Sequence, residues 1–502
     1  MSVCLKSWLG WVGCFAAALM LAPVASTQRA AAQQRTAPEA DAAQSQERSP
    51  ARRNRRTRQR PESQRGPNGS RSESFRTDVP SRAYDIVLGR PTDSSVTVSV
   101  LAYSDMQGRV EYGIHPGDYS SESEVVELRA GDPVELRLDR LEPNTAYFYR
   151  WRGRTDGSED FESSDESRFH TRRLSGDGFV FTLQSDPHLD DRTEPSLYEA
   201  SLANAAAAQP DFHIDLGDTF MVDKRRDDFR ESLAQYLAQR YYFGLIGRSA
   251  PVFLVSGNHD GEGLSRGAMG EWAREQRRKY FATPSDDYPD WGNYYSWEWG
   301  DALFVALDPF WATQRRRGGN EQWGRTLGDE QYRWLRDTLE QSRARFKFVF
   351  IHHLVGGKDQ AVRGGVASAH LFEWGGRDLD GTEQFDERRP GWGKPIHQLL
   401  ADTGVTILFH GHDHMFAKEE LDGVVYQLVP QPGLDRYGAP RSAREYGYVH
   451  GKVLGGPGIL RVQVSGDETQ VDLVRPYVEG GRGPNGETAY SYRVRPRCAG
   501  GC

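Results

Sequence analysis

Cysteine is scarce in this chain: there are four in 502 residues, two in the first 14 positions and two in the last five. No disulfide-dense scaffold and no central thiolate metal site can form, because the stretch between Cys14 and Cys498 has no cysteine. The C-terminal Cys498-Ala-Gly-Gly-Cys502 can pair into a small loop in an oxidising compartment, stay free, or bind adventitious metal.

Long apolar runs are also missing. The longest, Trp8 to Leu21, is short for a membrane-spanning helix. It follows Lys6 and precedes Pro23-Val-Ala25, which is the layout of a secretory signal peptide. We therefore expect residues 1–25 to be a signal peptide and the mature protein to be exported, either periplasmic or extracellular.

Bulky apolar side chains are almost absent from residues 26–77, which are rich in Arg, Gln and Ala and predict a disordered linker. Its basic run, Arg52 to Arg60, could make weak contact with anionic envelope components, although a solvated linker explains it more simply. The net charge is −8, and because the linker is basic, the folded remainder carries about −16. This balance predicts no specific nucleic-acid partner.

Residues 78–172 alternate apolar and polar side chains over short segments such as Val96–Val100 and Val134–Leu138. This period of two, with turn residues between segments, predicts a small all-β sandwich. Leu141-Glu-Pro-Asn-Thr-Ala-Tyr147 resembles the L-x-P-x-T-x-Y segment of fibronectin type III domains. By that resemblance Leu141 and Tyr147 anchor the core and Pro143-Asn144 turn the chain.

Residues 173–475 contain apolar runs of strand length that suggest strands buried on both faces. Segments with apolar residues three or four apart predict helices at 195–208, 227–245, 268–281 and 329–342. The strands are expected at 179–185, 212–216, 251–256, 346–351 and 405–409, and later segments at 424–429 and 458–464 are expected to complete a second sheet. Residues 476–502 are assigned to a C-terminal tail.

Short polar clusters follow the first five strands. They are Asp186/His188, Gly217-Asp218, Gly257-Asn258-His259-Asp260, His352-His353 and Gly411-His412-Asp413-His414. Ligands gather beyond strand ends in such sheets, and carboxylate, imidazole and amide groups suit ions such as Mn, Fe and Zn. Asp218 is the natural bridge, since a carboxylate can hold two cations roughly 3.5–4 Å apart.

These clusters resemble the pattern D-x-H, G-D, G-N-H-[DE], a lone His and G-H-x-H of calcineurin-like metallophosphoesterases, over about Phe179 to Asp472. The resemblance implies a fold of the α/β class. Its architecture would be an α+β four-layer sandwich, in which two β-sheets pack together and helices flank them. The resemblance also implies one metal held by Asp186, His188, Asp218 and His414, and a second by Asp218, Asn258, His352 and His412. His259 would stand beside the scissile bond, oriented by Asp260.

The neighbourhood of these motifs is most similar to purple acid phosphatases, with two departures. Met221 stands where those enzymes place a metal-binding tyrosine, so Fe(III) is not specifically implied and the two ions could be Fe, Mn or Zn. Leu354 replaces the proline of the usual His-x-Pro, and adjacent strand-end side chains point opposite ways, so only one of His352 and His353 can face the site. We favour His352.

Residues 355–394 form an insertion without clear periodicity, at a catalytic strand end where substrate recognition is often placed. The candidates for substrate contact are Arg363, His370 and Arg377, with Glu373, Trp374 and Trp392 as further members that could equally hold the loop together.

The sequence thus predicts an exported dinuclear-metal enzyme that hydrolyses small phosphomono- or phosphodiesters by in-line attack of a metal-bridging hydroxide. A metallo-β-lactamase-like site is a weaker alternative, since His410-Gly-His412-Asp-His414 is one residue short of the H-x-H-x-D-H spacing. An alternative from another class is a cell-envelope binding protein whose metal domain is weakly active or inactive. The oligomeric state and the physiological ester stay open.

Overall fold

The computed structural model describes residues 75–155, 157–224, 228–261, 268–284, 294–313, 322–355, 363–438 and 440–497. They belong to one compact unit, Arg71–Cys502. The expected signal peptide, nearly all of the linker, and the Cys498 and Cys502 pair lie outside the described residues. Among the helices that are described, none is both long and apolar enough to cross a membrane.

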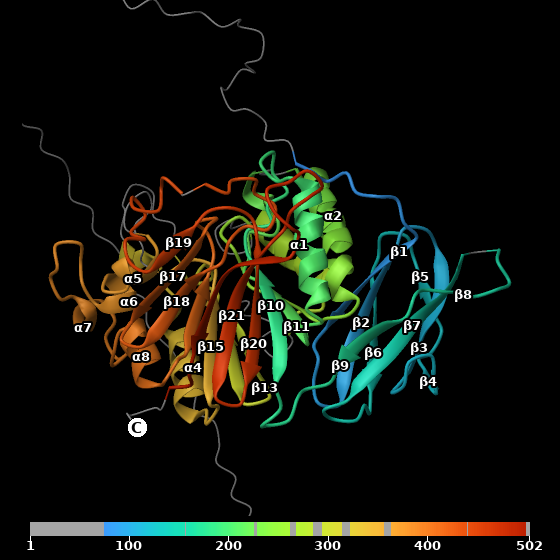
Figure 1. Ribbon diagram of the computed structural model, residues 1–502, viewed down its shortest axis with the longest axis horizontal. Helices are drawn as coiled ribbons and strands as arrows, with labels where there is room; N and C mark the ends of the chain where they lie inside the picture. Colours follow the sequence, from blue (N-terminus) through green and yellow to red (C-terminus); the bar gives the residue numbers. More distant parts are fainter. Residues whose placement is uncertain are drawn as a thin grey trace, which may run out of the picture. The chain divides into compact units, whose positions relative to one another are not determined.

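Two antiparallel sheets come first in the chain (Figure 1). The smaller has the order β1-β2-β6: Tyr84–Gly89, Ser95–Ala102 and Val134–Asp139. The larger has the order β4-β3-β7-β8: Ser121–Glu122, Met106–Gly113, Ala146–Thr155 and Glu162–Ser163. In addition β5 (Val126–Leu128) pairs with β3, and β9 (Ser167–His170) pairs with β7.

The core of this sandwich follows the period of two in its sequence. Along β7 the residues alternate between buried and half-buried, so that Tyr147, Tyr149 and Trp151 face inward. The Tyr147 hydroxyl accepts a hydrogen bond from the Glu142 backbone N–H at 2.8 Å, and its ring stacks on Phe169. A β-sandwich therefore precedes the second part of the chain as predicted, whereas its kinship to fibronectin type III domains stays a prediction.

Two larger sheets pack face to face in the second part (Figure 1). The first has the order β12-β11-β10-β20-β21-β22: Val252–Leu254, Phe212–Asp215, Phe179–Gln184, Ile459–Ser465, Glu468–Arg475 and Glu487–Val494. The second has the order β13-β14-β15-β16-β18-β17-β19: Tyr295–Trp299, Ala302–Ala306, Phe346–Ile351, Ile407–His410, Val424–Leu428, Phe416–Leu421 and Lys452–Leu454.

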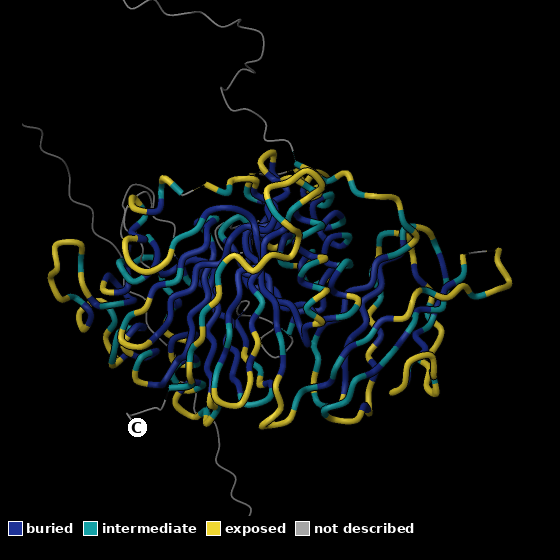
Figure 2. Tube along the Cα trace, in the orientation of Figure 1, coloured by how far each residue is buried: buried dark blue, intermediate teal, exposed yellow. Residues whose placement is uncertain are grey.

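Aromatic side chains fill the space between these sheets. Phe181, Phe212 and Phe304 are fully buried there, with ring centroids 5.1–5.5 Å apart. Edge-to-face and stacked pairs of this kind add to the stabilisation from burial alone. Figure 2 shows the result as an almost continuous buried region along both sheets.

Helices cover the outer faces. On the first sheet lie α1 (Pro195–Ala207), α2 (Phe229–Gly247) and α3 (Ala268–Tyr280), whose apolar residues pack in two separate clusters. On the second sheet lie α4 (Gly328–Gln341), α6 (Phe372–Gly375) and α8 (Ile396–Asp402), with the short α5 (Gly365–Ser368) and α7 (Phe385–Arg388) beside them. Helix, sheet, sheet and helix are the four layers that the sequence predicted.

Two sequence assignments are wrong. The segment at 458–464 was expected in the second sheet, yet β20 pairs with β10 in the first. The assigned C-terminal tail contains β22, which pairs with β21 over Glu487–Val494 and so extends the first sheet. Both errors have one cause: a strand's sequence shows that it is buried, but its partner depends on contacts between distant segments.

Candidate metal centre

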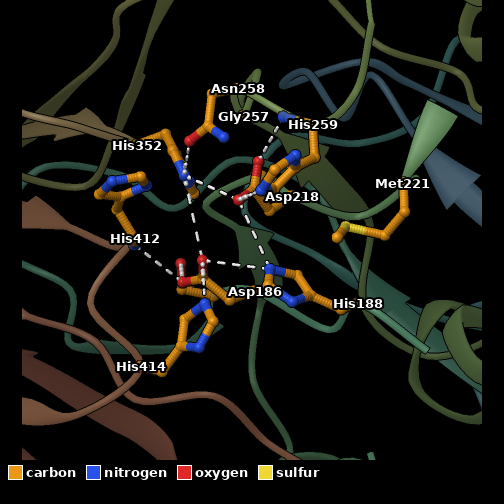
Figure 3. Close-up of polar contacts among 12 residues, drawn as sticks. Asp186, His188, Asp218, Met221, Gly257, Asn258, His259, His352, His412 and His414 are labelled. Carbon is orange, nitrogen blue, oxygen red and sulfur yellow. Dashed lines mark hydrogen bonds and ion pairs between the residues drawn. The ribbon is translucent and has the colours of Figure 1, made fainter. Parts of the chain in front are cut away.

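The polar clusters meet at one edge of the fold because of strand direction. Strands β10, β11 and β12 are parallel, and so are β15 and β16. Each cluster begins at or just after the carboxyl end of one of these strands, and such ends lie side by side in a parallel sheet. The order of the five is Asp186/His188, Asp218, Asn258/His259, His352 and His412/His414 (Figure 3).

Four of these residues have a left-handed backbone, which non-glycine residues seldom adopt. The φ angle is 59° at Asp186, 55° at Asp218, 80° at His412 and 55° at His414. Each such conformation costs on the order of 1–3 kcal/mol and persists only where the surroundings enforce it. Backbone strain concentrated at these four residues is typical of a ligand-binding site.

The motif glycines are needed because the loops approach one another too closely for a side chain. A Cβ at Gly217 would lie 2.4 Å from the Gly257 backbone nitrogen, and one at Gly257 would lie 2.0 Å from that of Asp218. At Gly411 it would lie 1.9 Å from the Ser185 hydroxyl oxygen. These three glycines therefore allow the ligand-bearing loops to touch.

Asp186, His188 and His414 form a first group of potential ligands, with the ligand atoms within 4.8 Å of one another. His414 Nε2 lies 3.2 Å from Asp186 Oδ1. His188 Nε2 lies 3.6 Å from the same oxygen and 3.4 Å from Asp218 Oδ2, so it faces both carboxylates.

Asp218, His352 and His412 form a second group within the same distance limit. His352 Nδ1 donates to the Leu216 carbonyl oxygen at 2.9 Å, while its Nε2 lies 3.2 Å from both Asp218 Oδ2 and Asn258 Oδ1. The neighbouring His353 is buried with its ring against His412, at a centroid distance of 4.3 Å. Of the two histidines, His352 is the one that faces the carboxylates.

Several buried polar atoms in these groups approach other ligand atoms but make no hydrogen bond to any described residue: Asp186 Oδ1 and both ring nitrogens of His188 and of His412. An unpaired buried polar atom costs about 1–3 kcal/mol, so native proteins rarely tolerate five together. Oxygen and imidazole donors in this arrangement fit divalent metal ions, which would satisfy them. The residues present therefore fit the two ions expected from the sequence.

The electrostatics of the centre agree with cation binding. Burial raises the pKa of Asp186, but the nearby His414 and His352 outweigh it and hold that pKa well below its usual range. Asp218 behaves likewise, with His352 and His259 as its partners. Burial and the proximity of His352 push the pKa of His412 well below its usual range. The two carboxylates are therefore ionised and the His412 imidazole is neutral, as metal ligands must be. Burial lowers the pKa of His352, but Asp218 and Asp186 outweigh it and raise that pKa to about 9, which shows how strongly the two carboxylates attract positive charge.

His259 stands at the side of the centre, and its orientation corrects the sequence prediction. Its Nδ1 lies 2.9 Å from Asp223 Oδ1, and its backbone N–H donates to Asp218 Oδ1. The Asp260 carboxylate instead accepts from the backbone N–H groups of Gly257, Asp218 and Phe220. Asp260 therefore joins two ligand loops, and Asp223 positions the imidazole.

The sequence did not identify two carboxylates that contact histidines of the centre, Asp223 and Asp190. Asp190 Oδ2 lies 3.5 Å from His188 Nδ1 and accepts from the Arg192 guanidinium at 2.6 Å. A carboxylate behind a ligating histidine fixes its ring and tautomer. For Asp190 the available signal was its place two residues after His188, whereas nothing in the sequence connects Asp223 with His259.

Met221 is buried beside this region, with its backbone N–H donating to Gln235 Oε1 at 2.7 Å (Figure 3). Its equivalence to the tyrosine position of purple acid phosphatases stays a prediction from the sequence.

The substrate candidates of the insertion separate in space. Arg363 lines a cavity together with His412 and His414. His370 does not line that cavity, and Arg377 forms an exposed ion pair with Glu383. The remaining three have structural contacts. Glu373 pairs with Arg389 within the insertion, while Trp374 donates to the Tyr426 hydroxyl of β18 and Trp392 donates to Asp329 of α4.

Comparisons with known proteins agree with this geometry. The family model described as calcineurin-like phosphoesterase matches residues 179–416, a segment that includes every potential ligand named above. No curated protein matches the sequence.

Among solved structures, PhoD is 14% identical, with 86% of this chain and 92% of that chain covered and a TM-score of 0.60. GAP50, the anchor in the inner membrane complex of Plasmodium, is 12% identical over 64% of this chain and 90% of that one, with a TM-score of 0.38. The similarity to PhoD shows a shared fold. With the match of residues 179–416 to the calcineurin-like phosphoesterase model and the geometry of the centre, this chain is a metal-dependent phosphoester hydrolase.

Proposed function

We propose that the chain is an exported enzyme that uses two metal ions to hydrolyse small phosphomono- or phosphodiesters. The observation that carries the proposal is the pair of adjacent ligand groups, Asp186/His188/His414 and Asp218/His352/His412. When bound, the two ions supply an acidified water as nucleophile and neutralise charge on the phosphoryl oxygens.

The ligand assignment follows from position. Asp186, His188 and His414 would hold one ion, while Asn258, His352 and His412 would hold the other. Asp218 lies within 3.4 Å of both His188 and His352, so its carboxylate can serve both ions. A shared carboxylate offsets the repulsion between two neighbouring cations.

The protonation step falls to His259. Burial lowers its pKa, but the charges of Asp218 and Asp223 outweigh this and raise the pKa above its usual value. A protonated imidazole next to the reacting group can donate its proton to the leaving oxygen. Asp223 holds the ring through Nδ1, so that Nε2, which lies 3.9 Å from Asp218 Oδ2, can carry this proton.

Two measurements on the purified mature protein test the proposal. Elemental analysis should find two ions per chain of Fe, Mn or Zn, and Asp218→Ala should lose one or both. The wild type should hydrolyse p-nitrophenyl phosphate or bis-p-nitrophenyl phosphate with at least one of these metals. No turnover by folded, metal-loaded protein would contradict the proposal and favour the envelope-binding role.

Export rests on the N-terminal sequence. Its layout of Lys6, an apolar segment and Pro23-Val-Ala25 is that of a signal peptide. Mass spectrometry of the protein recovered from its native host should find a mature N-terminus after Ala25 or Ala32. An intact N-terminus on protein retained inside the cell would contradict export.

A further inference from the structure

A cavity of about 530 Å³ opens beside the metal centre. His412 and His414, one potential ligand from each group, form part of its wall. Cavities of this size hold small organic molecules. A phosphoryl group at the metal centre would therefore have the rest of its molecule next to this space.

Arginine dominates the charge of the cavity. Four line it, Arg192, Arg363, Arg436 and Arg441, against a single acid, Asp413. The folded part of the chain is acidic overall, so four guanidinium groups around one cavity are a local exception. A concave, positively charged surface attracts anions.

Two of these arginines are held in place by carboxylates. Arg363 forms an ion pair with Asp413 at 2.5 Å, and its guanidinium lies 3.7 Å from the centroid of the Tyr446 ring. Arg192 pairs with Asp190 at 2.6 Å. Fixed guanidinium groups lose little entropy when they bind a ligand, so they preorganise this side of the cavity.

The other two carry uncompensated charge. Arg436 and Arg441 are exposed, and across the described part of the chain neither has a carboxylate within ion-pair distance. Both come from the segment between β18 and β19, which lies beyond the metal ligands in sequence. An anion that enters here meets two positive charges that no carboxylate of the described residues pairs with.

We propose that this cavity binds a second anionic group of the substrate, a phosphate, phosphonate or carboxylate separate from the phosphoryl group that is hydrolysed. The proposal rests on the proposed function, because it takes the reacting phosphoryl group to lie at the metal centre. The preferred substrates then carry at least two anionic groups, and Arg436 and Arg441 select them.

A matched pair of esters isolates the second anion. Propyl phosphate and 3-phosphonopropyl phosphate share one scissile P–O bond and the same leaving-group chain, and the C–P bond of the phosphonate is not hydrolysed. We expect the wild type to prefer the phosphonate ester by about fivefold or more in kcat/KM, because each of two exposed, water-screened ion pairs contributes modestly.

The variants are Arg436→Gln and Arg441→Gln, singly and together. Each single change should reduce the preference, and the double variant should bring it to within about twofold of unity, with the larger loss of kcat/KM on the phosphonate ester. Arg444→Gln is the matched control, because Arg444 is exposed on the same segment but does not line the cavity. The control should retain the full preference.

Calorimetry of the same two esters with metal-loaded protein measures equilibrium binding. It separates the second anion site from the proposed hydrolytic function. If neither ester is hydrolysed but the phosphonate still binds more tightly through Arg436 and Arg441, the hydrolytic function fails and the second anion site stands. Equal binding of both esters by the wild type, or a preference that survives in the double variant, overturns the proposal.

Discussion

The contact between Asp223 and His259 leads to a sharp prediction about leaving groups. If His259 donates the proton and Asp223 only positions it, weakening their contact should slow esters with poor leaving groups and spare activated ones. An alkoxide must be protonated as it departs, whereas p-nitrophenolate leaves without help. Asp223→Asn and Asp223→Ala provide two graded perturbations.

The size of the expected loss in kcat/KM follows from the geometry of the Asp223–His259 contact. The two side chains are each 20% exposed and 2.9 Å apart, so the contact is mostly shielded from water. A hydrogen bond to a charged group is worth about 1.5–3 kcal/mol and a neutral one about 0.5–1.5 kcal/mol. Asp223→Asn, which removes the charge, should therefore reduce kcat/KM for propyl phosphate about tenfold, and Asp223→Ala about 10- to 100-fold.

The assay compares propyl phosphate with p-nitrophenyl phosphate in a double-mutant cycle with His259→Ala. That single change should reduce propyl phosphate turnover by roughly 10²–10⁴ with metal content intact, and adding Asp223→Ala should reduce it little further. The control is Asp191→Asn, which changes an exposed acid next to Asp190 in sequence. It should leave the turnover of both esters unchanged. Equal losses on both esters, or fully additive losses in the cycle, would refute the positioning role.

Two further predictions concern the framework of the site. Gly257→Ala places a Cβ 2.0 Å from the Asp218 backbone nitrogen and should displace Asp218, so elemental analysis should find fewer than two ions per chain. Gly466→Ala, whose Cβ would have nothing within 4 Å, should keep both ions. Arg240→Met removes a buried guanidinium that donates to the carbonyl oxygens of Ser99, Asp85 and Tyr280, which joins the sandwich to the metal domain. Urea unfolding should show a loss of about 3 kcal/mol or more, against less than about 0.5 kcal/mol for the exposed Arg230→Met, and equal stability of the two variants would contradict this reasoning.

Much of the fold could be predicted because burial leaves a local pattern. The helix expected at 195–208 is α1 at Pro195–Ala207, and the strand expected at 346–351 is β15 at Phe346–Ile351. Strand partners left no such pattern, so β20 was assigned to the wrong sheet and β22 was taken for a tail.

In the candidate site, too, local sequence patterns predicted some residues and only the coordinates revealed others. His352 and Asp218 lie at strand ends, where the sequence placed them, and the structure brings them to 3.2 Å from each other. Asp223 and Arg436 lie in connections without periodic patterns, so their neighbours could be known only from coordinates.

The sequence by itself determined the chemistry: which donors are present, in which order, and that each follows a buried strand. This is possible because a strand's length and burial are written in consecutive residues, and parallel strands end at a common edge. The tertiary structure alone decided which side chains meet across that edge: Asp223 against His259, Asp190 behind His188, and the arginines around the cavity. Those contacts join residues from separate loops, whose paths depend on the packing of the whole fold rather than on any local pattern.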